Sequence, residues 1–261
     1  MKLAFSLFKA CFFLLTISIV AAAHAQETKM ATVKGGTYIP LYGADVDGAR
    51  LKVASFQLDI YPVTNAQFLT FLKANPEWRR STVKRLFADE RYLIDWEGDL
   101  NFGKTNLPAA PITNVSWFAA KKYCECQGKR LATMDEWEYA AMADEKLTDA
   151  RTKTQFNSFI LSWYEKAKTD NNPVGSTFKN YWGIYDLHGL VWEWTSDFNS
   201  VFIAGESRKA MLGDANLFCG SSAVGASDLM NYAAFMRYAF RGSIKASYST
   251  KNLGFRCAKS L

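Results

Sequence analysis

Two carboxylates that bracket a glycine turn are the residues of this chain whose types and spacing best suit chemistry. Asp186 and Glu193 flank Gly189, and tryptophans stand on both sides of Glu193, at positions 192 and 194. Carboxylate and backbone carbonyl oxygens are the ligands that calcium prefers, and glycine allows the sharp turn of a loop wrapped around an ion. The tryptophans can pack beneath it as a rigid apolar floor. By spacing alone, a cation-binding loop and an ordinary β-hairpin with buried aromatic rings fit this run equally well.

Histidine is scarce, which excludes several classes of site. The chain has 2 histidines, and one of them, His24, falls in the N-terminal segment that we expect to be removed. A histidine-rich iron or zinc site therefore cannot be built in the mature protein. A Ser-His-Asp triad would have to use His188, which lies inside the loop described above, so we expect His188 to be a surface residue or a hydrogen-bonded structural residue.

The N-terminus has the pattern of a secretory signal peptide. Lys2 and Lys9 form a positive region, residues 10–22 are apolar, and residues 23–25 read Ala-His-Ala, a small-x-small cleavage site. We expect cleavage after Ala25 and export, in a bacterium to the periplasm. The remaining residues 26–261 are expected to form one domain, without a membrane span.

Charge and composition argue against a nucleic-acid partner. Loss of Lys2 and Lys9 lowers the formal net charge from +6 to +4, and the basic cluster at 79–91 is followed closely by acidic residues. A solvated charged surface explains this pattern better than a nucleic-acid surface. Aromatic residues make up 15% of the chain, and glycine and proline occur throughout it. This profile indicates a loop-rich domain whose irregular backbone rests on buried rings.

Three helix starts can be predicted from capping residues. Thr64 and Gln67 form a capping box for a helix that ends at Asn75-Pro76. Ser116 is a good N-cap for a helix over 117–127, and a second capping box at 133–136 opens another helix. Residues 35–40, 55–60 and 252–257 are expected to form strands. Residues 144–180 show no clean period, and residues 232–241 mix aromatic and basic side chains.

Five motifs occurring in order resemble the formylglycine-generating enzyme (sulfatase-modifying factor) family. They are Thr64-Asn65 with Phe68, Val115-Ser116-Trp117, the segment 128–139 (GKRLATMDEWEY), Trp192-Glu193-Trp194, and residues 252–257 (NLGFRC). The resemblance covers residues 34–259. It implies an α+β, C-type-lectin-like fold with many loops, little regular secondary structure and calcium inside.

By this resemblance, the loop binds one structural calcium ion. Asp186 and Glu193 match the side-chain ligands, and Gly189 and Val191 match the positions that contribute backbone carbonyls. Leu190 stands where the family usually has asparagine. The family's second calcium site has no counterpart in residues 150–180.

The resemblance also suggests roles for the cysteines. Cys124 and Cys257 match positions that form a disulfide in some family members, and two separately buried thiols are the alternative. Residues two apart on a helix point to different faces, so Cys126 is expected to face away from Cys124. A disulfide between Cys126 and Cys219, a shared copper ion, and a buried thiol at Cys126 all remain open.

The copper site of the family is broken in this sequence. Formylglycine-generating enzymes hold Cu(I) between two cysteines and use oxygen to oxidise a cysteine of a substrate protein; thiolates suit Cu(I). Cys219 is a plausible match to the first of these cysteines, but counting back from NLGFRC places the second at about Ala233, which cannot ligate. Copper is therefore a weak candidate for a cofactor, and we do not expect standard sulfatase activation.

Three functions are compatible with these observations. The run from 218 to 241 resembles a divergent, exported branch whose members are often encoded beside copper nitrite reductase, which suggests a maturation or accessory factor acting on a periplasmic protein or peptide. Its cleft would contain Trp192 and Cys219 as catalytic candidates and Arg237 and Arg241 as substrate-binding residues that hold a carboxylate or other anion. Ion pairing of the two arginines with nearby acidic residues is an alternative that fits the sequence at least as well. The alternatives are a copper-dependent cysteine oxidase with altered ligands and a non-catalytic, lectin-like binding module. The oligomeric state cannot be inferred.

Overall fold

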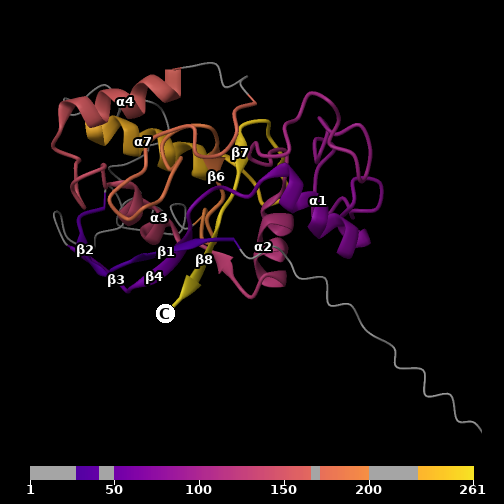
Figure 1. Cartoon of the computed structure of the whole chain (residues 1–261), viewed down its shortest axis with the longest axis horizontal. Coiled ribbons are helices and arrows are strands. Elements are labelled where there is room, and N and C mark those ends of the chain that lie inside the picture. Colours follow the sequence, from indigo (N-terminus) through magenta and orange to yellow (C-terminus); the bar gives the residue numbers. More distant parts are fainter. Residues whose placement is uncertain (1–27, 41–49, 166–170, 200–228) are drawn as a thin grey trace, which may run out of the picture.

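The fold is a mixture of short strands, short helices and long irregular segments (Figure 1). The computed structural model describes residues 28–40, 50–165, 171–199 and 229–261. Cys219 lies outside these residues, as does the expected signal peptide. The expected α+β architecture with few regular elements is confirmed, whereas the C-type-lectin-like assignment stays a prediction.

One four-stranded antiparallel sheet forms the base of the fold. Its strands follow the order β1 (Met30–Val33), β4 (Phe56–Asp59), β8 (Cys257–Ser260) and β5 (Arg130–Leu131). A separate pair consists of β2 (Gly36–Tyr38) and β3 (Leu51–Val53). The strand expected at 55–60 is β4. The strand expected at 252–257 divides between β7 (Leu253–Gly254) and the first residue of β8, so the chain joins two sheets there.

The three helices predicted from their capping residues are confirmed. They are α1 (Asn65–Ala74), α2 (Trp117–Cys126) and α3 (Met134–Ala141), and a short 3-10 turn, η1 (Pro76–Trp78), follows α1. The side chains of Thr64, Ser116 and Thr133 each accept a backbone hydrogen bond in the first turn, and α1 and α3 have complete capping boxes. These bonds satisfy N–H groups that a helix start leaves unpaired.

Two further helices, α4 (Thr154–Glu165) and α7 (Leu229–Ser243), pack on each other (Figure 1). They occupy the stretch 144–180, in which the sequence shows no clean period, and the stretch around 232–241, which mixes aromatic and basic residues. In α7 the buried residues include both alanines and arginines, because the helix faces α4 on one side and a charged cluster on another. A pattern that counts only apolar residues therefore misses it.

The main core consists of aromatic rings held between α1, α2 and the C-terminal strands. Phe68 contacts the rings of Tyr123 and Phe255 at centroid distances of 6.0 and 6.3 Å. Beside them, Cys124 of α2 and Cys257 of β8 form the disulfide that the resemblance implies. Cys126 is exposed and free, so it faces away from this core as expected from helix geometry, but it is not the buried thiol that we had considered.

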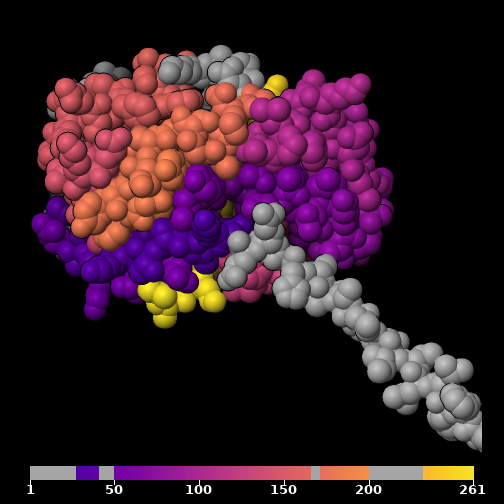
Figure 2. Space-filling view, in the orientation of Figure 1, coloured from indigo at the N-terminus to yellow at the C-terminus, as the bar shows by residue number. Residues whose placement is uncertain are grey.

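Part of the segment 171–199, orange in Figure 2, is exposed between the N-terminal strands and α4, whereas several of its residues, Asp186 and Trp194 among them, are buried. Within the described part of the chain, no helix has both the length and the apolar character needed to cross a bilayer.

Candidate functional site

The loop at 183–197 is anchored to the C-terminal strand and does not form a hairpin of its own. Its only strand, β6 (Trp192–Glu193), pairs in parallel with β7. The turn before it has three residues with positive φ: Asp186 at 61°, Gly189 at 133° and Leu190 at 48°. A Cβ on Gly189 would lie 2.8 Å from the Thr177 methyl group. Glycine is therefore required at 189 for both conformation and space.

The Asp186 carboxylate organises the preceding segment. It accepts hydrogen bonds from the backbone N–H of Gly175 (2.5 Å) and of Thr177 (2.9 Å), and from the Thr177 hydroxyl (2.9 Å). Asp186 as a whole is 1% exposed, so its carboxylate is buried. Asp186 thus ties residues 175–177 to the turn.

The Glu193 carboxylate is paired with Arg256. The guanidinium donates from Nε and Nη2 to Glu193 at 2.8–3.0 Å, and Trp137 Nε1 donates to Glu193 Oε2 at 2.8 Å. Arg256 also donates to the carbonyls of Asp59, Ile60 and Tyr185. Buried charges need such partners, since neither side chain retains contact with water.

These contacts bear on the expected calcium ligands. Both oxygens of Glu193 already accept two hydrogen bonds, and a guanidinium lies beside them, so Glu193 as placed does not fit a calcium ligand. Among the described residues, no three His, Cys, Asp or Glu side chains gather as a metal-holding group. These contacts involve side chains only and do not concern the backbone carbonyls of Gly189 and Val191. Calcium binding by this turn therefore stays a prediction.

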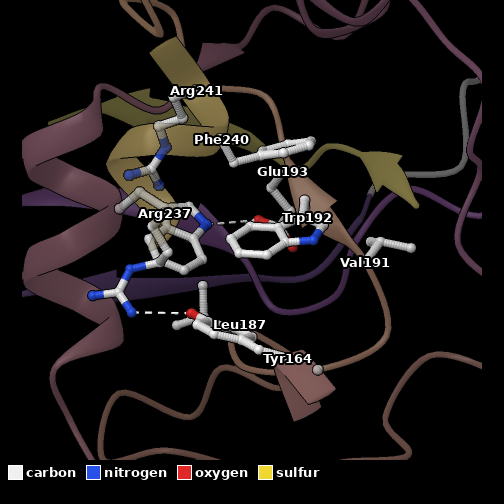
Figure 3. Close-up of a pocket in the computed structure, with 10 residues that line it drawn as sticks. Tyr164, Leu187, Val191, Trp192, Glu193, Arg237, Phe240 and Arg241 are labelled. Atoms are coloured by element: carbon white, nitrogen blue, oxygen red, sulfur yellow. Dashed lines mark hydrogen bonds between the residues drawn. The ribbon is translucent and has the colours of Figure 1, made fainter. Parts of the chain in front are cut away.

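Trp192, a catalytic candidate, is the middle ring of an aromatic stack. Tyr164 of α4 and Phe240 of α7 each lie 4.8 Å from its ring, at interplanar angles of 27° and 26° (Figure 3). Both faces of the indole are therefore covered by protein rings. Trp192 can position other groups but cannot stack on a ligand with either face. Trp194, in contrast, is a core residue whose Nε1 donates to the Val115 carbonyl.

The two arginines predicted to bind substrate do come together, around Glu138 of α3. Arg237 donates from Nε and Nη2 to Glu138 at 2.6–3.0 Å, and Arg241 donates from Nη1 at 2.7 Å. Arg237 Nη1 also donates to the Tyr164 hydroxyl at 3.0 Å. Burial alone would raise the pKa of Glu138, but the two guanidinium groups outweigh it and lower this pKa to about 2.

These residues surround a narrow pocket of about 20 Å³ (Figure 3). This volume is enough for roughly one water molecule. The wall combines the aromatic stack, the arginines and the 187–193 turn; it is formed by Trp137, Tyr164, Leu187, Gly189, Val191, Trp192, Glu193, Arg237, Phe240 and Arg241. The sequence did not single out Tyr164 or Phe240, which lie on α4 and α7, two helices that were not predicted. Glu138 lies in a predicted helix and in the 128–139 motif, but its role depends on arginines about 100 residues away.

His188 is a buried, hydrogen-bonded structural residue, which is one of the two roles expected for it. Its Nε2 lies 2.6 Å from the Ala141 carbonyl oxygen, and its ring meets Trp137 and Phe156 edge-on. Burial lowers the pKa of His188 to about 3, so the ring is neutral and donates from Nε2. It does not reach a serine–aspartate pair.

Ala233, where the second copper cysteine is expected, is fully buried in α7. It packs with Phe156 and Ile160 of α4 and with Ala150. The candidate first cysteine, Cys219, lies outside the described residues, so its distance from Trp192 and the arginines is not defined.

A second, wider pocket of about 380 Å³ lies on the other side of Val191 and is polar. It is lined mainly by amide, hydroxyl and charged side chains, namely Asp95, Thr105, Asn106, Thr113, Asn171, Asn172 and Lys251, together with Ala110, Pro111, Leu190 and Val191.

Comparison with known proteins agrees with this architecture. Inactive Cα-formylglycine-generating enzyme 2 of Mus musculus is 28% identical over 95% of this chain and 91% of its own length. Formylglycine-generating enzyme of Streptomyces coelicolor is 32% identical over 90% of this chain and 77% of its own. The solved structure of PvdO from Pseudomonas aeruginosa superposes with a TM-score of 0.51 at 21% identity, covering 90% of this chain and 95% of its own, and shows the shared fold.

Fold and site together define a loop-rich α+β domain whose pocket is built from a Trp-Glu-Trp loop, two helices and buried arginines. The model of the sulfatase-modifying factor enzyme 1-like domain matches residues 18–261. The chain belongs to this family.

Proposed function

We propose that this protein is a divergent family member that assists the maturation of an exported partner protein and does not oxidise cysteine through a two-thiolate copper site. The observation that carries the proposal is Ala233. A methyl group packed against α4 occupies the position at which the resemblance places the second copper thiolate. One cysteine cannot reproduce a two-coordinate Cu(I)–thiolate site.

The names of the relatives support a fold that occurs both with and without cysteine oxidation. The relatives include one named inactive Cα-formylglycine-generating enzyme 2 and one named formylglycine-generating enzyme, at 28% and 32% identity to this chain. The same fold can therefore be kept without the chemistry. The buried, ion-paired core of the site and the Trp192 stack above it would hold the surrounding loop in one conformation, which suits recognition of a partner.

The location and the partner are proposed from the sequence. The signal-peptide pattern of residues 1–25 supports export to a bacterial periplasm, and the similarity to the branch encoded beside copper nitrite reductase supports a periplasmic protein or peptide as partner. In this proposal, residues 190–192 and the two pockets beside them contact the partner. Cys219 is retained as the candidate reactive group.

Cysteine oxidation can be assayed directly. Reduced mature protein is incubated with Cu(I), oxygen and a synthetic peptide that contains one cysteine, and aldehyde formation is followed by mass spectrometry. The Streptomyces coelicolor relative serves as the positive control. We expect no aldehyde; aldehyde formation that is lost in Cys219→Ser would establish the alternative, a copper-dependent oxidase with altered ligands.

Partner contact is tested by photocrosslinking in the exporting cell. A photoreactive amino acid replaces Leu190, which lines the wider pocket, and in a matched control it replaces the exposed Tyr181. We expect a discrete crosslinked protein from position 190 only. Identical products from both positions, or none from position 190, would contradict the proposal.

A further inference from the structure

The buried cluster beneath Trp192 contains two cations and one anion. Glu138, Arg237 and Arg241 are 7%, 3% and 4% exposed. Arg237 is well satisfied, because its Nε and Nη2 bind Glu138 and its Nη1 binds the Tyr164 hydroxyl. The single carboxylate therefore balances the charge of only one of the two guanidinium groups.

Arg241 is the under-satisfied member. Among the described residues, Arg241 donates one hydrogen bond, from Nη1 to Glu138 Oε1. Its guanidinium otherwise lies over the rings of Trp137 and Tyr238, 5.0 and 5.9 Å from their centroids. Asp197 is near enough to feel its charge, but within the described part of the chain Arg241 forms an ion pair with Glu138 alone. No described residue accepts a hydrogen bond from Nε or Nη2 of this almost fully buried side chain.

Among the described residues, no carboxylate other than Glu138 hydrogen-bonds to Arg241. Asp197 attracts it only through space and accepts a hydrogen bond from the Met134 backbone N–H. Glu193, across the pocket, is neutralised by Arg256. Burial raises the pKa of Tyr164, so its hydroxyl stays protonated and uncharged. A buried cation without a counter-charge is costly, and an anion that enters next to it gains a charge-assisted hydrogen bond.

The position of Arg241 in the pocket sets the size of that anion. Arg241 and Arg237 line the pocket of about 20 Å³ together with Trp137 and Trp192. There is room for one oxygen-sized group, so a carboxylate would insert one of its oxygens while the rest of the group stays at the opening of the pocket. The apolar rings around that oxygen lower the local dielectric.

We propose that Arg241 forms an anion subsite that takes a single carboxylate. The source of the carboxylate rests on the proposed function: an acidic side chain or the chain terminus of the partner reaches the subsite past Val191 and Trp192. Arg237 acts as a positioning residue, because it holds Glu138 and Tyr164 while Arg241 meets the ligand.

Acetate is the probe for this subsite. Mature protein is titrated with sodium acetate, with sodium methanesulfonate replacing it at constant ionic strength, and the melting temperature and indole fluorescence are recorded. We expect a saturable rise in melting temperature with acetate, because a ligand that binds only the native state stabilises it. Arg241→Gln should raise the half-saturating concentration at least about tenfold, the effect of losing one charge-assisted hydrogen bond.

Two variants keep the result interpretable. Lys251→Gln removes an exposed cation from the neighbouring pocket and should respond like the wild type. Arg241→Lys retains the charge but has fewer directed donors, so it should bind acetate with intermediate strength even if Arg241→Gln does not fold. The proposal is overturned if the wild type shows no saturable response, if Arg241→Gln or Arg241→Lys responds like the wild type, or if Lys251→Gln also loses the response.

Two compounds then distinguish a chain terminus from an acidic side chain as the source of the carboxylate. N-acetylglycine offers a terminal carboxylate, and N-acetylaspartic acid α-amide offers a side-chain carboxylate. These titrations need no partner protein. Acetate binding without crosslinks at position 190 would therefore support the anion subsite and contradict the proposed partner contact. Crosslinks at position 190 without acetate binding would support the partner contact and contradict the subsite.

Discussion

At the scale of single residues, the turn before Trp192 carries local strain. Leu190 adopts a φ of 48°, in the left-handed region that disfavours residues with branched or bulky side chains. Asparagine, which the resemblance places at this position in the family, tolerates that region better. Leucine is therefore expected to make this turn less stable than asparagine would.

Leu190→Asn is expected to stabilise the protein by up to about 1 kcal/mol, because it relieves this backbone strain. Urea unfolding at neutral pH measures the effect. Leu190→Ala is the matched control, since alanine removes the same apolar contacts and retains the strain. A stability of Leu190→Asn at or below that of Leu190→Ala would contradict the argument.

The lowered pKa of His188 predicts how the stability of the fold changes in mild acid. Its pKa falls from the ordinary 6.5 to about 3 in the native state, so the unfolded chain binds a proton below pH 6.5 that the native protein does not bind. Stability should therefore decrease as the pH falls from about 6.5 towards 3. Between pH 6.5 and 5, this one group should cost about 1–2 kcal/mol.

The measurement is urea unfolding at several pH values for the wild type and His188→Gln. Glutamine can still donate to the Ala141 carbonyl but does not titrate, so the variant should lose most of the slope between pH 6.5 and 5. Glu138 does not interfere, because its lowered pKa acts only at more acidic pH. Parallel profiles for the two proteins would refute the assignment to His188.

At the scale of elements, capping chemistry was readable from the sequence and packing was not. The starts of α1, α2 and α3 depend on side chains that bind their own helix, such as Thr64 with Gln67, and these local contacts were predicted correctly. The helices α4 and α7 depend on each other, and their buried faces include Asn157 and Arg237. No local pattern encodes such a pairing.

The candidate site shows the same division. The sequence identified Trp192, Arg237 and Arg241, and the structure brings all three to one pocket. It did not identify Tyr164, which reaches both Trp192 and Arg237 from α4. It assigned Glu193 to calcium by resemblance, whereas its partner Arg256 lies distant in sequence and could be found only from the folded chain.

Calcium binding is a property of the whole 186–193 turn and is tested there. By resemblance, we predict that excess EDTA lowers the melting temperature and that added calcium restores it, because an ion bound only to the native state stabilises it. Asp186→Ala should abolish the difference. An unchanged melting temperature in EDTA would contradict calcium binding. Arg256 would then be the cation that balances the charge of Glu193.

At the scale of the whole molecule, the Cys124–Cys257 disulfide joins α2 to the last strand across a sequence separation of 133 residues. Closing so long a loop restricts the unfolded chain, which corresponds to about 4–5 kcal/mol in the chain-entropy model. The double variant Cys124→Ala/Cys257→Ala should lose stability of this order in urea unfolding. Cys126→Ser, at an exposed free thiol, should stay within about 0.5 kcal/mol of the wild type.

If the double variant loses less than about 1 kcal/mol, the disulfide is not a main constraint on this loop-rich fold. A large loss in Cys126→Ser would instead show that this thiol has a structural partner.

The central claim is that the family's fold is kept here without its two-thiolate copper centre, and an anaerobic Cu(I) titration of the mature protein with its Cys124–Cys257 disulfide intact tests it most directly. The wild type and Cys219→Ser are titrated against a competing Cu(I) chelator. We predict that neither binds one equivalent tightly, because Ala233 supplies no second thiolate. Tight one-to-one binding that disappears in Cys219→Ser would contradict the account and identify a copper site with a different second ligand.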